Sequence, residues 1–115
     1  MSQRFLKLYR LKKKKDYQRV LSFHRSQKGS FFIMDYYFGD SQNPKLGISA
    51  STKFGSSPER NRFKRLIREI FRKDFSFFPK NIEMNIKPLV QAKDATFLQI
   101  EEDWKNSINQ IVKKA

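Results

Sequence analysis

The sequence contains no cysteine and only one histidine, His24, among its 115 residues. Without cysteine the chain has no disulfide, no thiolate nucleophile and no cysteine metal site, a composition typical of reducing compartments. Acidic residues are also few: 11 Asp and Glu stand against 25 Lys and Arg, so the formal net charge is +14. A chain with this balance is drawn to polyanions, either nucleic acids or anionic membrane surfaces.

Long apolar runs are absent as well. No stretch approaches the roughly 18 residues needed to span a bilayer, and the N-terminus lacks the apolar segment of a secretion signal. We therefore expect a cytoplasmic protein without a membrane partner. The hydrophobic content is only 38%, but 12 phenylalanines raise the aromatic content to 15%, which favours a folded core. We expect one domain, residues 1–115, with an irregular basic arm over residues 1–10.

The most informative stretch is residues 56–73, SSPERNRFKRLIREIFRK. It opens either with Ser56 and Glu59 at the spacing of a capping box, or with Ser57 as the cap and Pro58 as the first helical residue. Behind the cap, apolar residues recur with the period of an α-helix and form one stripe that would anchor the helix on a core. This stripe consists of Phe63, Leu66, Ile67, Ile70 and Phe71.

The opposite face of this predicted helix is almost wholly cationic. Arg60 and Arg62 flank the apolar stripe on its two sides, and only Glu59 and Glu69 interrupt the positive charges. The outward-facing cations are Lys64, Arg65, Arg68 and Arg72. A helix face that served solubility alone would mix both signs, so the pattern favours binding to a polyanion over a plain solvated face.

Three segments have the aromatic, β-branched or alternating patterns typical of strands. They are residues 31–38, 45–51 and 82–87. In the second, Gly47, Ser49 and Ser51 point to one side, where a ligand backbone could approach closely; an ordinary solvent-facing surface is an equally good reading. The order strand, helix, strand favours parallel pairing of the second and third segments across the central helix.

Two further helices are predicted from apolar periodicity, one over residues 14–24 and one over residues 97–113. Thr96 and Gln99 have the spacing of a capping box for the second of these. The remaining links are interpreted as turns or loops: residues 27–30, 39–44, 74–81 and 91–95.

No arrangement typical of catalysis or metal binding is found in the sequence. The nearest group of carboxylates, Glu101, Glu102 and Asp103, is interpreted as the solvated face of the last helix, and His24 is interpreted as structural. A nuclease with its own chemistry would typically need carboxylates or histidines around metal ions. We therefore expect no catalytic residue, and no metal or cofactor bound by the protein alone.

The stretch RNRFKRLIR, residues 60–68, resembles the RNR signature of the protein subunit of bacterial ribonuclease P. The resemblance extends upstream through residues 46–55 to the basic residues 10–21, and more weakly through residues 86–88 to the last helix. Nearly the whole chain is covered in the right order. Three places depart from the family pattern: Leu21, Thr52 and Ser57-Pro58.

The resemblance implies an α+β fold, a single-domain two-layer sandwich with a mixed sheet of about four strands. The central helix would be a crossover between parallel strands, with further helices near the two ends of the chain. Connections between parallel strands of one sheet are nearly always right-handed. The family is known for the rarer left-handed crossover, which we expect here.

The resemblance also implies a function. In that family the RNA subunit is the catalyst, and the protein helps to bind precursor tRNA so that its 5′ leader is removed by an endonucleolytic cut in the presence of Mg²⁺. The implied partners are this catalytic RNA and precursor tRNA, without DNA, for a monomeric protein in a one-to-one complex. Contacts to the catalytic RNA are expected from Arg60, Asn61, Arg62, Lys64, Arg65, Arg68 and Arg72. Contacts to the leader are expected from Lys12, Tyr17, Leu21, Ser49, Ser51, Lys53 and Lys87.

Three alternative functions are weaker. A small basic ribosomal protein, or another structural RNA-binding protein, would share the size and charge but would not be expected to carry the strand, turn and RNR helix together. The missing chemistry argues against an enzyme acting alone. A DNA-binding helix-turn-helix would need a second short helix just before Ser56, which the sequence lacks.

Overall fold

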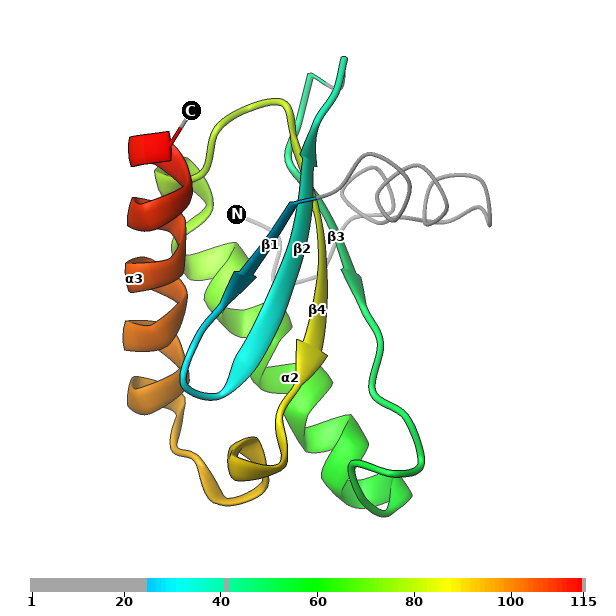
Figure 1. Ribbon diagram of the computed structural model, residues 1–115. Coiled ribbons are helices and arrows are strands. Elements are labelled where there is room, and N and C mark those ends of the chain that lie inside the picture. The colour runs from blue at the N-terminus through cyan, green and yellow to red at the C-terminus, as the bar shows by residue number, and fades with distance from the viewer. Residues whose placement is uncertain (1–24, 41, 115) are drawn as a thin grey trace.

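The computed structural model describes residues 25–40 and 42–114 (Figure 1). The predicted arm and first helix, and with them Lys12, Tyr17 and Leu21, lie outside these residues. The first half of the described chain contains β1 (Arg25–Lys28), β2 (Phe32–Phe38), β3 (Lys45–Ile48) and α2 (Ser57–Lys73). The second half contains β4 (Ile82–Pro88), α3 (Phe97–Lys114) and the short 3₁₀ helices η2 (Phe75–Phe77) and η3 (Val90–Asp94).

The four strands form one mixed sheet in the order β1-β2-β4-β3. Strand β2 is antiparallel to both β1 and β4, whereas β3 and β4 are parallel. Helix α2 connects these two parallel strands. In Figure 1 both strands run downward, β4 lies to the left of β3 and α2 passes behind them, so the crossover is left-handed. The α+β fold with a four-stranded mixed sheet is therefore confirmed.

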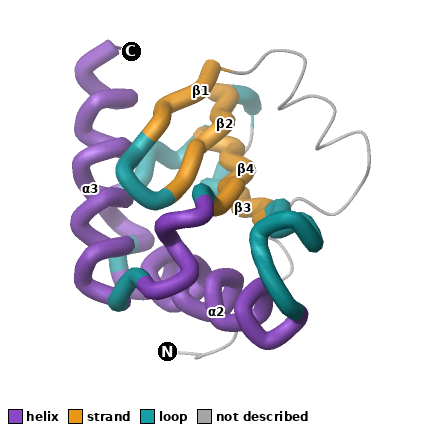
Figure 2. Tube along the Cα trace, turned by 60° about the horizontal axis from the view of Figure 1, so that its bottom comes forward, coloured by secondary structure: helices purple, strands orange, loops and turns teal. Residues whose placement is uncertain are grey.

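Helices α2 and α3 cover the same side of the sheet (Figure 2). The apolar stripe predicted for α2 faces this core, with Leu66 partly buried and the other four members fully buried. Trp104 of α3 is fully buried, and its ring centroid lies 5.8 Å from that of Phe32 and 5.6 Å from that of Phe78. Because the core takes one side of α2, the other side of that helix is left for solvent or a ligand.

Two boundaries of the sheet differ from the sequence prediction. Residues 27–30 were predicted as a turn, but Gln27 and Lys28 belong to the edge strand β1. The segment RSQK has no apolar alternation, and its conformation follows from its hydrogen-bonded ladder with β2. Strand β3 ends at Ile48 instead of residue 51, although the Ser49 N–H still donates to the Ile86 carbonyl at 2.9 Å.

The acidic triplet of α3 is also different from the prediction, because two of its three members are buried. Asp103 accepts hydrogen bonds from the backbone N–H groups of Ser30 (2.8 Å) and Phe31 (2.9 Å), and so fixes the β1–β2 hairpin to α3. Glu101 forms an ion pair with Lys73 at 2.9 Å. Only Glu102 is exposed. These partners lie far away in the sequence, where a local helical pattern does not reveal them.

Candidate nucleic-acid interface

Helix α2 begins with a complete capping box at Ser56, the first of the two predicted starts. The Ser56 N–H donates to Glu59 Oε1 at 2.8 Å, and the Glu59 N–H donates to Ser56 Oγ at 3.4 Å. The hydrogen bonds from Ser56 lower the pKa of Glu59, so this carboxylate is ionised at neutral pH beside the positive end of the helix. Pro58 lies in the first turn, where no hydrogen bond is lost.

The cations of α2 follow its outward side in the predicted order. Asn61, Arg65 and Arg68 are exposed, whereas Arg60, Lys64 and Arg72 are half-buried. From residue 61 to residue 72 the array extends about 16 Å along the helix axis, at about 1.5 Å per residue. A rigid helix therefore presents several cations at fixed spacing, which suits a folded RNA whose phosphates are also fixed.

Arg62 has a different environment from the outward cations. Its Nη1 donates to the Lys93 carbonyl at 3.2 Å, and its Nη2 donates to the Ala95 carbonyl at 2.6 Å. These two bonds connect α2 to the end of η3 and to the segment that leads into α3. By contrast, Arg60 donates from Nη2 to Ser57 Oγ, a neighbour on its own helix, at 2.9 Å.

A second candidate surface lies where β3 has ended beside the end of β4. A pocket of about 360 Å³ is lined there by Ser49, Ala50, Ser51, Phe54, Lys87 and Pro88. It brings together three residues predicted to contact the leader: Ser49, Ser51 and Lys87. Lys53 is exposed but does not line the pocket, and Gly47 is buried in β3. Of the three residues predicted to share one side of this strand, only Ser49 and Ser51, which follow its end, line the pocket.

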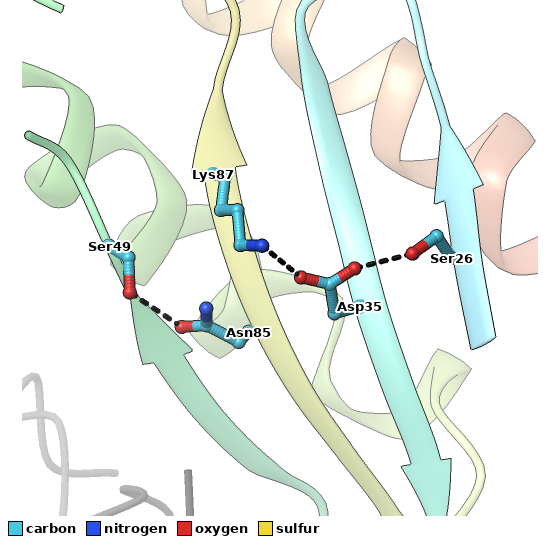
Figure 3. Close-up of polar contacts among 5 residues, drawn as sticks. All are labelled: Ser26, Asp35, Ser49, Asn85 and Lys87. Atoms are coloured by element: carbon cyan, nitrogen blue, oxygen red, sulfur yellow. Dashed lines mark hydrogen bonds and ion pairs between the residues drawn. The ribbon is translucent and has the colours of Figure 1, made fainter. Parts of the chain in front are cut away.

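Polar side chains continue from this pocket across the sheet (Figure 3). Ser49 Oγ donates to Asn85 Oδ1 at 3.2 Å. The Lys87 ammonium lies 2.7 Å from Asp35 Oδ2, and Ser26 Oγ donates to Asp35 Oδ1 at 2.6 Å. The pairing of Asp35 was not predicted from the sequence. The available signal was one acidic residue inside an apolar strand of a chain with few acids.

The described residues offer neither a metal cluster nor a membrane helix. Within residues 25–40 and 42–114, no three His, Asp or Glu side chains converge in a way that could hold a metal ion. None of the helices found in that part of the chain has the length and apolarity needed to cross a bilayer.

A mixed sheet bordered by a pocket with two serines and a lysine, and crossed by a cation-bearing helix between two of its strands, defines a small α+β domain suited to binding a polyanion. Comparison with known sequences identifies the family. A sequence model described as Ribonuclease P matches residues 5–112, and the chain belongs to this family of ribonuclease P proteins.

Individual relatives agree with this assignment. The "Ribonuclease P protein component" of Aromatoleum aromaticum is 35% identical over 107 residues, which cover 92% of this chain and 89% of the relative. A solved mutant of the Staphylococcus aureus RNase P protein is 32% identical, with a TM-score of 0.82 and coverage of 93% and 90% of the two chains. The RNase P protein from Thermotoga maritima has a TM-score of 0.80 at 25% identity, covering 88% and 96%. The resemblance given by residues 60–68 is confirmed.

Proposed function

We propose that this protein binds the catalytic RNA of ribonuclease P and the 5′ leader of precursor tRNA, and thereby supports removal of the leader. The observation that carries the proposal is the presence of two separate surfaces in the family's fold: the cationic face of α2 and the pocket beside β4. Cleavage itself belongs to the RNA, assisted by Mg²⁺, and the protein alone cuts nothing. One protein monomer serves one RNA in the cytoplasm.

The α2 face is the surface that we assign to the catalytic RNA. Its contributors are Arg60, Asn61, Lys64, Arg65, Arg68 and Arg72, with Arg62 at the inner margin. If the five cations other than Arg62 contact phosphates, the slope of log K against log salt concentration is roughly -3.5 to -4.5, at about 0.7 to 0.9 per contact. A salt titration of protein binding to the RNA measures this slope. A slope near zero would contradict the assignment.

The pocket is the surface that we assign to the leader. Ser51 offers a hydroxyl donor and Lys87 an ammonium, both suited to a phosphodiester of single-stranded RNA, whereas the Ser49 hydroxyl donates to Asn85 and lines the pocket. Precursor tRNA has a leader to place there, whereas mature tRNA has none. Ser49→Leu fills the pocket without changing charge, so it should weaken precursor binding and leave mature tRNA binding unchanged. Ser76→Leu, at an exposed serine of η2, is the matched control.

The decisive experiment is reconstitution. The full chain is mixed with a bacterial ribonuclease P RNA at low Mg²⁺, and removal of the leader from precursor tRNA is followed. We expect correct cleavage with both components and none with the protein alone. A small basic ribosomal protein would bind RNA but would not restore cleavage, and that outcome would overturn the proposal.

A further inference from the structure

Asp35 is a buried acidic residue that contacts the pocket through Lys87. Its residue exposure is 2%, and its polar partners include Ser26 Oγ at 2.6 Å and Lys87 Nζ at 2.7 Å. The side chain of Lys87 is still 44% exposed. A buried carboxylate is costly unless it is paired and hydrogen-bonded. The ion pair with Lys87 therefore offsets the cost of burying the Asp35 carboxylate, while the Lys87 side chain still reaches the surface.

The strand register accounts for this geometry. Ser26 of β1 lies directly opposite Asp35 of β2, so the two side chains share one face of the sheet. Lys87 of β4 lies opposite Ile33, two residues from Asp35, and is its diagonal neighbour. A diagonal neighbour is within reach of a long side chain. The carboxylate is thus held between a hydroxyl group on one strand and an ammonium group on another (Figure 3).

The same ammonium belongs to a residue that lines the pocket. Lys87 and Pro88 line it from β4, and Ser49, Ala50, Ser51 and Phe54 line it from the segment after β3. The hydrogen bond from Ser49 to Asn85 fixes that segment to β4. The pocket volume of about 360 Å³ lies at the lower end of the range for small-ligand sites. One sugar-phosphate unit of a single strand is a ligand of suitable size and chemistry.

We propose that Asp35 is a positioning residue that makes this pocket selective for a correctly placed phosphodiester of single-stranded RNA. This role of Asp35 rests on the proposed function of the pocket, and it explains how the pocket selects its ligand. The nearby carboxylate cancels much of the Lys87 charge at long range, so a polyanion passing at a distance is attracted only weakly. At short range the ammonium keeps donors that Asp35 does not use. A phosphate that fits the pocket gains these bonds, whereas one held elsewhere does not.

The test is paired binding of precursor and mature tRNA to the reconstituted holoenzyme at several salt concentrations. Asp35→Asn is nearly isosteric and frees the Lys87 charge. For both ligands, the slope of log K against log salt concentration should become steeper by up to about 0.9. Asp35→Asn should also lower the precursor-to-mature affinity ratio about tenfold, the loss typical of one charge-assisted hydrogen bond. Ser26→Ala, which removes one bond to Asp35 without changing charge, should lower the ratio in the same direction by about twofold.

Two further variants separate the possible outcomes. Lys87→Met should also lower the precursor-to-mature affinity ratio, and it should destabilise the fold because the buried Asp35 carboxylate loses its cation. Adding Asp35→Asn to Lys87→Met should restore the free energy of unfolding but not the affinity ratio. Lys80→Met, at an exposed lysine before β4, should leave the ratio unchanged. If Lys87→Met lowers the ratio and neither Asp35→Asn nor Ser26→Ala does, the positioning role is refuted and the leader pocket stands. If Lys87→Met and Ser49→Leu both leave the ratio unchanged, the leader pocket itself is refuted.

Discussion

Replacing Arg62 should separate the stability of α2 from its RNA binding. Arg62→Ala removes two hydrogen bonds from a charged donor to the Lys93 and Ala95 carbonyls. Such bonds contribute about 1.5–3 kcal/mol each when buried, and the half-buried position reduces the sum to roughly 2–3 kcal/mol. For a chain of this length each kcal/mol changes Tm by about 3–6 °C. We therefore expect Tm to fall by roughly 6–18 °C.

Arg65→Ala is the matched control, because Arg65 is an exposed arginine on the same helix. Its free energy of unfolding should change by no more than about 0.5 kcal/mol, whereas the salt slope of RNA binding should become shallower by about 0.7–0.9. Arg62→Lys keeps the charge but cannot reproduce the two-pronged contact, so it should lose most of the stability that Arg62→Ala loses.

Thermal unfolding gives Tm for each variant, and a salt titration with the catalytic RNA gives the slope. We expect different results for the two positions. Arg62→Ala should lower Tm and leave the salt slope nearly unchanged. Arg65→Ala should leave Tm nearly unchanged and make the salt slope shallower. The argument would be refuted if Arg62→Ala left Tm unchanged and reduced the slope as much as Arg65→Ala does. In that case Arg62 would act mainly as another phosphate contact.

Two further predictions concern the buried carboxylates of α3. A Cβ at Gly29 would lie 2.5 Å from Asp103 Oδ2, so Gly29→Ala should displace this carboxylate and cost about 1–3 kcal/mol; in an Asp103→Ala background the same change should cost much less, and equal costs in both backgrounds would contradict the clash. The hydrogen bond from Lys73 lowers the pKa of Glu101 below its usual 4.5 against the opposing effect of burial, so the stability that it contributes is present above that value and is lost as pH falls through the lowered pKa. The difference in unfolding free energy between wild type and Glu101→Gln should therefore be largest near neutral pH and shrink in acid, and a difference that grows in acid would contradict this sign.

Much of the fold could be predicted because its signals are local. The apolar stripe of α2, the Ser56–Glu59 capping box and the Thr96–Gln99 capping box all depend on residues within a few turns of one another. The structure contains all three; the Gln99 N–H donates to Thr96 Oγ1 at 3.2 Å, and the Thr96 N–H donates to Gln99 Oε1 at 2.9 Å. Family resemblance supplied the handedness of the crossover, which no local pattern of the chain encodes.

The parts that could not be predicted depend on partners distant in the sequence. Asp103 is buried because the β1–β2 turn presents two N–H groups to it, and Arg62 is fixed because η3 presents two carbonyls. The position of a residue on a helical wheel shows which side of the helix it occupies but not which residues of other elements it contacts. Similarly, Lys87 is expected from the sequence to contact the leader, and only the strand register reveals its pairing with Asp35.

The parallel pairing of β3 and β4 also determines the order in which the two candidate surfaces can form during folding. Strand β3 has β4 as its sole ladder partner in the described sheet, and Lys45 pairs with Glu83 across the whole of α2. Closing so long a loop costs chain entropy before any contact repays it. The two sides of the pocket lie at opposite ends of that loop. A chain emerging from the ribosome can therefore present the cations of α2 before β4 has been made, but it gains the pocket only once β4 has joined the sheet.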